Sequence, residues 1–162
     1  MVGADFAPEM LLSARRKVDA QGLADVVLAV ADATRLPFAD ETFDCVSSGF
    51  LVRNVVDPAE AFREMWRVLK PGGLVVCLEA SRRAGRTGAV LRGGFGLVAR
   101  LFGRVVAGDA AAYGYLPDSA AAFASPAELA ATMARAGFVE VRYSLLGCGM
   151  IALHRGRRPR AI

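Results

Sequence analysis

The sequence has few cysteines, a single histidine and no long apolar run, and each shortage excludes a class of protein. Cys45, Cys77 and Cys148 lack the spacing of a metal site and lie in apolar runs, which predicts three buried thiols. With His154 as the only histidine, no cluster of Cys, His and carboxylate side chains offers a metal site. No apolar stretch is long enough to span a membrane and no signal peptide is visible, so we expect a cytoplasmic protein.

The formal net charge is +4, but the basic residues are not concentrated in one segment. The arginines are spread along the chain without a dense tract or interleaved aromatic residues, which argues against nucleic-acid binding. The mild positive charge suits an acidic or membrane-bound partner without identifying one. Hydrophobic residues make up 54% of the 162 residues, which is enough for the core of a single domain.

Strand and helix signals alternate along the chain, which indicates an α/β protein with a mostly parallel sheet. Strands are expected at residues 2–5, 26–30, 43–47 and 74–78, and the second of these suits burial on both faces. Helices are expected at residues 8–20, 57–69 and 125–137. The second helix begins with Asp57 as a cap and Glu60 in a capping box, whereas Ala7 caps the first only weakly.

The C-terminal part departs from this alternation in two places. Residues 82–107 are rich in Gly, Arg, Leu and Val and carry no acidic residue, which predicts an insertion that extends to residue 124. Strands at residues 138–146 and 150–154 are too close in sequence for a crossover connection, so they are expected to form an antiparallel hairpin. The domain is therefore expected to span residues 1–156, followed by a flexible tail at residues 157–162.

Polar residues stand at the ends of three predicted strands. In an open parallel sheet, ligands bind at the carboxyl ends of the strands. Asp5 can accept hydrogen bonds from both hydroxyls of a ribose, and Asp32 can accept one from an adenine amino group. Ala33 is small enough to let the ring approach, and the pair Ser48 and Gly49 ends the next strand. The ordered set indicates a nucleotide site more strongly than any one member does.

Several motifs carry a resemblance to a known family. The motif RVLKPGG at residues 67–73 is common to many methyltransferases, and its continuation to Glu79-Ala80-Ser81 resembles the ubiquinone/menaquinone biosynthesis C-methyltransferases more narrowly. Val52-Arg53-Asn54-Val55 is similar to the LRNV motif of that family, and residues 108–119 are similar to its GDAxxYxYLxxS motif. The resemblance extends to ALHRG at residues 152–156, so it covers essentially the whole chain.

This resemblance implies a class I methyltransferase that uses S-adenosyl-L-methionine. Its fold is a Rossmann-like α/β sheet, mostly parallel with an antiparallel C-terminal hairpin. The glycine-rich cofactor loop and the first strand are expected upstream of Met1, outside the chain. The implied reaction is methylation of a ring carbon of a prenylated quinol, with demethylmenaquinol the preferred substrate and a ubiquinone precursor the next.

The resemblance also assigns roles to individual residues. Arg53 and Asp5 are the catalytic candidates, because Arg53 can stabilise a phenolate and Asp5, or a water that it holds, can accept a proton. The cofactor-binding candidates are Asp5, Asp32, Ala33, Ser48 and Gly49. The substrate-binding candidates are Arg53, Asn54, Glu79, Asp109, Tyr113 and Tyr115.

Two other functional classes stay open from the sequence. One is a methyltransferase of the same fold that acts on another small molecule, and the other is an inactive truncated remnant. The basic stretch at residues 82–107 is either a solvated face or a site of peripheral membrane contact. A homo-oligomer also stays open. His154 is expected near the end of the last strand, far from the expected site, so a catalytic role for it is disfavoured.

Overall fold

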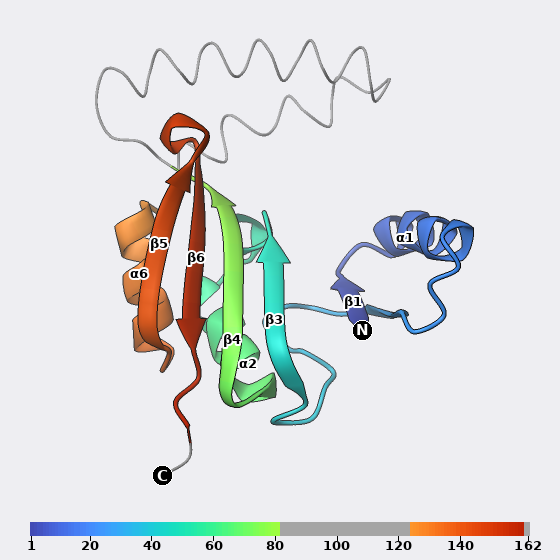
Figure 1. The fold of residues 1–162 in the computed structure, drawn as a ribbon, viewed down its shortest axis with the longest axis horizontal. Coiled ribbons are helices and arrows are strands. Elements are labelled where there is room, and N and C mark those ends of the chain that lie inside the picture. The colour runs from blue at the N-terminus through green and yellow to red at the C-terminus, as the bar shows by residue number, and fades with distance from the viewer. Residues whose placement is uncertain (82–123, 161–162) are drawn as a thin grey trace.

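The structure is a computed structural model that describes residues 1–81 and 124–160 (Figure 1). Three of the expected substrate-binding residues, Asp109, Tyr113 and Tyr115, lie outside the described residues, as does the predicted insertion at residues 82–107. The described elements alternate between strands and helices, as the sequence predicts.

The strands form two hydrogen-bonded groups. Strand β1 (Val2–Asp5) pairs in parallel with β2 (Val27–Val30). The second group has the order β3-β4-β6-β5, built from β3 (Phe43–Gly49), β4 (Leu69–Ala80), β6 (Ile151–Arg157) and β5 (Val139–Leu146). Strands β3 and β4 are parallel, while β6 is antiparallel to both β4 and β5, which confirms the expected C-terminal hairpin.

Each described α-helix begins as its sequence indicates. Helix α1 (Pro8–Ala20) has Ala7 at the cap position without a side-chain hydrogen bond. Helix α2 (Pro58–Val68) is capped by the Asp57 carboxylate, which accepts from the backbone N–H groups of Ala59 and Glu60. The Glu60 side chain pairs with Arg63 instead of completing the expected capping box. A full capping box is present at Ser125 and Glu128, before α6 (Pro126–Arg135).

The core lies between the four-stranded group and the pair of helices α2 and α6, which cover the same face of that sheet (Figure 1). Phe62 of α2 meets Phe138 edge to face, with ring centroids 6.5 Å apart. Leu129 and Met133 of α6 are almost fully buried beside them. Alternate residues of β4, such as Val75 and Cys77, point to this helical layer because successive side chains of a strand face opposite sides.

Three expectations about strands and burial were wrong. Strand β4 begins at Leu69 and runs through Gly72 and Gly73, whereas the sequence predicted a start at residue 74. Only glycine fits at position 73 of this strand, because a Cβ atom there would lie 2.8 Å from the Lys70 carbonyl oxygen. Strand β2 is not buried on both faces, since the side chains of Val27 and Val30 are exposed. Among the described residues, β2 has a strand partner on one edge only, which is β1. Of the cysteines only Cys77 is buried, whereas Cys45 and Cys148 are exposed.

The C-terminal strand also extends further than expected. Strand β6 continues through Arg157, which pairs with Leu74 and Val139 on the two neighbouring strands. Arg158 is anchored as well, because its guanidinium donates to the Leu69 carbonyl at 2.6 Å. The first two residues of the expected flexible tail therefore belong to the folded domain.

Candidate active site

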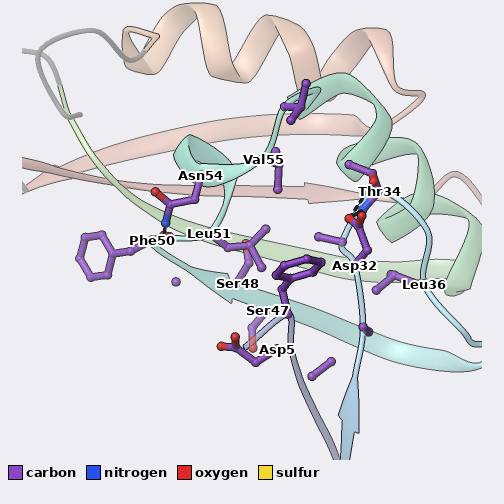
Figure 2. A pocket seen from close by; sticks show the side chains of 16 residues that line it. Asp5, Asp32, Thr34, Leu36, Ser47, Ser48, Phe50, Leu51, Asn54 and Val55 are labelled. Atoms are coloured by element: carbon purple, nitrogen blue, oxygen red, sulfur yellow. Dashed lines mark hydrogen bonds between the residues drawn. The ribbon is translucent and has the colours of Figure 1, made fainter. Parts of the chain in front are cut away.

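The carboxyl ends of β1, β2 and β3 surround a cleft of about 570 Å³ (Figure 2). Five sequence-predicted cofactor-binding residues meet at this cleft, together with the predicted substrate residue Asn54. The cleft is lined by Ala4, Asp5, Phe6, Ala31, Asp32, Ala33, Thr34, Leu36, Ser47, Ser48, Gly49, Phe50, Leu51, Asn54, Val55 and Val56. The strand ends thus converge as expected for an open parallel sheet.

Asp5 ends β1 and fixes the turn into α1. Its Oδ1 accepts a hydrogen bond from the backbone N–H of Ala7 at 2.8 Å. This bond supplies the local anchor that Ala7, with no polar side chain, does not supply itself. The half-buried carboxylate is held at the wall of the cleft, where it can accept hydrogen bonds from ligand hydroxyls (Figure 2).

Asp32 follows β2 and is oriented by Thr34, which the sequence analysis did not single out. The Asp32 Oδ1 accepts from the backbone N–H of Thr34 at 2.8 Å and from its hydroxyl at 2.7 Å. These two bonds hold the pKa of the Asp32 carboxyl below its usual value, the backbone bond having the larger effect. Asp32 is therefore ionised near neutral pH, and Ala33 beside it leaves room for a flat ring.

A second group of residues holds the loop after Asp32 against α2. The Arg67 guanidinium donates to the carbonyl oxygens of Leu36 and Phe38, at 3.0 and 2.8 Å. It also pairs with Glu64, and Glu64 Oε2 accepts from the backbone N–H of Leu36 at 2.7 Å. Arg67 is the first residue of the RVLKPGG motif, but the motif alone does not show which groups this arginine contacts.

The turn after β3 forms the other wall of the cleft. Phe50 has a φ of 55°, a backbone conformation that is uncommon for a residue other than glycine. Its carbonyl oxygen accepts from the Asn54 side-chain amide at 2.9 Å, which closes the turn around the short helix η1 (Val52–Asn54). A strained backbone conformation of this kind persists where the surrounding contacts hold the turn in place.

Arg53 belongs to this turn and Glu79 lies beneath it, but neither is among the lining residues of the cleft. Arg53 is half-buried and its guanidinium carbon lies 5.3 Å from the centroid of the Phe50 ring. Glu79 is fully buried, with 1% of its surface exposed, and its Oε1 accepts from the backbone N–H of Val52 at 2.6 Å. Burial raises the pKa of the Glu79 carboxyl, and the Val52 N–H and the Arg53 charge oppose that rise.

His154 lies in the core away from the cleft, as expected. Its side chain is fully buried, Nε2 donates to the Pro126 carbonyl at 2.9 Å, and the ring centroid lies 5.5 Å from that of Tyr143. Burial lowers the pKa of His154, so the ring is neutral in the folded protein near pH 7. Its neighbour across the sheet, Cys77, has its pKa raised by burial to about 12 and is therefore an unreactive thiol.

The charge of the cleft limits what can bind there. Among the described residues, the lining contains two carboxylates, Asp5 and Asp32, and neither lysine nor arginine. An electrostatic environment of this sign favours a ligand with positive charge, in addition to the hydroxyl and amino groups that the carboxylates can bind. Within the described ranges, no group of three or more His, Cys, Asp or Glu residues could hold a metal ion. In the same part of the chain, no helix is long and apolar enough to cross a membrane.

The fold matches solved structures of methyltransferases. A SAM-dependent methyltransferase from Aquifex aeolicus aligns with a TM-score of 0.68 and 18% identity, over 96% of this chain and 67% of that one. A phosphoethanolamine N-methyltransferase from Haemonchus contortus, in complex with S-adenosyl-L-methionine, aligns with a TM-score of 0.69 and 14% identity, over 98% of this chain and 43% of that one. At this level of identity the match establishes the fold.

Relatives with higher identity establish the family. The demethylmenaquinone methyltransferase of Thermus thermophilus is 48% identical over 160 residues, which is 98% of this chain and 72% of that protein. The enzymes of the same name from Roseiflexus sp. and Deinococcus radiodurans are each 43% identical, over 96% of this chain and 64% of theirs. The chain thus spans about two thirds of the length of these relatives. The model of the ubiE/COQ5 methyltransferase family matches residues 1–158. The expectation drawn from the motifs is therefore confirmed: the chain belongs to the ubiE/COQ5 family of S-adenosyl-L-methionine-dependent methyltransferases.

Proposed function

We propose that the site described above methylates a ring carbon of demethylmenaquinol, with S-adenosyl-L-methionine as the methyl donor. The observation that carries the proposal is the cleft itself, in which two carboxylates from adjacent strand ends face the turn that carries Arg53 and Asn54. The substrate follows the names of the relatives, which are 40–48% identical demethylmenaquinone methyltransferases.

The residues of the cleft fit the cofactor. Asp5 would accept hydrogen bonds from the ribose hydroxyls, and Asp32, already ionised and oriented by Thr34, would accept from the adenine amino group. Ala33, Ser48 and Gly49 would line the path of the ring and the sugar. When bound, the cofactor supplies an electrophilic methyl group on a sulfonium, and the two negative charges of the lining favour that positive charge.

The proposed substrate needs help to lose a proton. A quinol hydroxyl has a pKa near 10 in water, roughly that of a phenol, so its anion must be stabilised before the ring carbon becomes nucleophilic. Arg53 lies at the turn beside the cleft and would supply the positive charge for the phenolate oxygen. Asp5, or a water held by it, would accept the proton, and Asn54 would bind the second ring oxygen. Asp109, Tyr113 and Tyr115, which lie outside the described residues, remain candidates for the substrate side.

The division between the two groups of strands supports a further part of the proposal. Within the described residues β1 pairs only with β2, and β3 pairs only with β4, so the facing edges of β1 and β3 have no strand partner. We propose that a strand between them completes a single sheet and that the glycine-rich loop following it binds the methionine part of the cofactor. A lipid-tailed substrate also supports peripheral membrane contact through residues 82–107, which the structure does not describe.

The test is an assay of the full-length protein with radiolabelled S-adenosyl-L-methionine and lipid quinone extracts. We expect label in menaquinone when extract from a demethylmenaquinone-accumulating strain is supplied. Arg53→Ala should lower kcat by roughly 10²-fold, as for loss of a preorganised stabilising donor. The control Arg142→Ala changes an exposed arginine of β5 and should leave kcat unchanged. Label in a compound other than a quinone, or normal turnover without Arg53, would refute the proposal.

A further inference from the structure

Glu79 is a substrate-binding candidate by sequence, but the structure places it outside the cleft. Its carboxyl group lies in the protein interior, under the turn after β3, and it is absent from the lining of the cleft. A buried carboxyl group is costly unless it is hydrogen-bonded, so its presence requires a structural reason. The contacts of Glu79 are with the backbone of the turn and not with the open part of the site.

One backbone N–H group of the turn donates a hydrogen bond to this carboxyl group, whereas its Oε2 has no hydrogen-bond partner among the described residues. Val52 donates to Oε1 at 2.6 Å, and the N–H groups of Leu51 and Arg53 also stabilise its charged form. The Arg53 guanidinium adds a favourable charge interaction. The residues on either side, Leu51 and Asn54, line the cleft (Figure 2). One side chain of β4 is therefore hydrogen-bonded to the backbone of the segment that leads from the strand end to the substrate side.

Packing and other hydrogen bonds also define the shape of this turn, because Val52 is fully buried in the hydrophobic core and Leu51 packs against that core. The first residue of the turn, Phe50, has a positive φ and is fixed by its N–H bond to the Leu78 carbonyl at 2.8 Å. The Asn54 backbone N–H bonds to Leu51 inside the turn, at 2.9 Å. Between these two points, the Val52–Glu79 bond is a hydrogen bond that ties the backbone of the turn to β4, in addition to the packing of the Val52 side chain. A shift of about 1 Å in a group beside the reaction centre can cost on the order of 10²-fold in rate.

We propose that Glu79 is a positioning residue: its buried carboxyl group holds the backbone at Val52 and thereby places Arg53 and Asn54 beside the cleft. The role of Arg53 in this inference rests on the function proposed above. The link between Glu79 and the turn does not, because it concerns only the fold. Glu79 would act without touching the substrate.

The test compares three variants of the full-length protein. Glu79→Gln keeps an acceptor for the Val52 N–H at nearly the same place, Glu79→Asp withdraws it by one methylene, and Glu79→Ala removes it. We expect kcat within about threefold of the parent for Glu79→Gln. For Glu79→Asp and Glu79→Ala we expect losses of about tenfold or more. The KM for S-adenosyl-L-methionine should change little in all three, since Asp5 and Asp32 are untouched.

Amide hydrogen exchange provides a readout that does not depend on activity. In the parent and in Glu79→Gln, the Val52 amide should be protected, and in Glu79→Asp its exchange should be at least tenfold faster. The Phe50 amide, which bonds to the backbone of β4, should stay protected in every variant and serves as the internal control. A rapidly exchanging Val52 amide in the parent would overturn the inference even if a variant fails to fold.

The two proposals fail in distinguishable ways. If Glu79→Gln loses as much turnover as Glu79→Ala while Val52 stays protected, then Glu79 takes part directly in binding or chemistry and the positioning role is wrong. A second outcome is that the parent shows no quinol methylation, while the Val52 amide is protected in the parent and in Glu79→Gln and exchanges faster in Glu79→Asp. In that case the proposed function is wrong and the link between Glu79 and the turn stands.

Discussion

The guanidinium carbon of Arg158 lies 3.8 Å from the centroid of the Trp66 ring, at the end of α2. The same guanidinium donates to the carbonyl oxygens of Trp66, Arg67 and Leu69, at 3.2, 3.1 and 2.6 Å. The last carbonyls of a helix have no partner within the helix, so an arginine from the C-terminal segment satisfies them here. Arg158 thereby ties the end of the chain to α2 and to the start of β4.

We expect Arg158→Ala to lower the free energy of unfolding by about 2–3 kcal/mol, since hydrogen bonds to charged groups and a cation–π contact are lost together. Chemical denaturation of the full-length protein measures the change. The matched control is Arg155→Ala, an exposed arginine of β6 that precedes Arg158 in the chain, for which we expect less than about 0.5 kcal/mol. Equal effects of the two substitutions would contradict this role for Arg158.

Arg67→Ala should release the loop that follows Asp32. The substitution removes the donors to Leu36 and Phe38 and the ion pair with Glu64, which then keeps its bond to the Leu36 backbone N–H. We therefore expect faster hydrogen exchange in residues 35–41 and about tenfold weaker binding of S-adenosyl-L-methionine, because a lost charge-assisted bond of this kind costs about 1.5–3 kcal/mol. Arg63→Ala, on the exposed face of the same helix, should change neither quantity. Unchanged exchange in the loop of Arg67→Ala would show that other contacts hold it.

The elements were predictable from the sequence because their signals are local. Helix α1 begins and ends where the pattern of apolar residues places it, and the caps at Asp57 and Ser125 need only three or four residues to be recognised. The strand ends with Asp5 and Asp32 were found because parallel strands always bring their carboxyl ends to one edge. These predictions depend on spacing and not on partners far along the chain.

The errors and omissions concern contacts between distant residues. Arg67 and Arg158 act through bonds to residues far along the chain, and the geometry of these bonds exists only after the loops and helices have packed. Thr34 is the exception, because it bonds to Asp32, its near neighbour in sequence. Cys45 lies in an apolar run but faces away from the helices. The burial of Glu79 behind the cleft, and not inside it, depends on where the turn of Val52 folds over β4.

The pH dependence of stability should contain two opposing contributions. The pKa of Glu79 is raised on folding, so the folded protein binds more protons than the unfolded chain above about pH 4.5, and stability from this group falls as pH rises through its folded pKa. The pKa of His154 is lowered on folding, so stability from this group is lost as pH falls below about 6.5.

Unfolding titrations of the full-length protein between pH 4.5 and 8 test these signs. Relative to the parent, Glu79→Gln should gain stability as pH rises, because the variant has no carboxyl to ionise. Relative to the parent, His154→Gln should gain stability as pH falls below 6.5, since the variant has no buried ring to protonate. A difference that does not vary with pH in either variant would mean that the group titrates equally in both states.

Asp5→Ala should weaken binding of S-adenosyl-L-methionine, and it should also lower kcat at saturating cofactor because Asp5 is the proposed proton acceptor. Two charge-assisted hydrogen bonds to ribose contribute on the order of 1.5–3 kcal/mol each, which corresponds to at least tenfold in Kd for each bond. Isothermal calorimetry measures the affinity. Asp44→Ala, which removes a carboxylate paired with Lys70 outside the cleft, is the control. Equal affinities of Asp5→Ala and the parent would refute the ribose contact.

The last prediction concerns a protein made of residues 1–162 alone. The edges of β1 and β3 that face each other have no strand partner among the described residues, and large apolar side chains are exposed on the β1–α1–β2 unit, notably Phe6, Val27 and Val30. Each unsatisfied backbone group costs about 1–3 kcal/mol when buried, against a domain stability of roughly 5–15 kcal/mol. Unpaired edges also accept strands from other chains. We therefore expect this protein to associate or melt without cooperativity and to bind S-adenosyl-L-methionine weakly.

Light scattering, calorimetric melting and cofactor titration of residues 1–162 measure these three properties. The variant Cys45→Lys places a charge on the exposed side of β3, close to the unpaired edge, and should reduce association, because lysine at an edge disfavours strand addition. The exposed position Arg135 on α6 lies away from that edge, so Arg135→Lys should associate as strongly as the parent. A monomer that melts cooperatively and binds the cofactor with micromolar affinity would show that β1 and β3 need no further strand, and the proposal of a strand between them would fall with it.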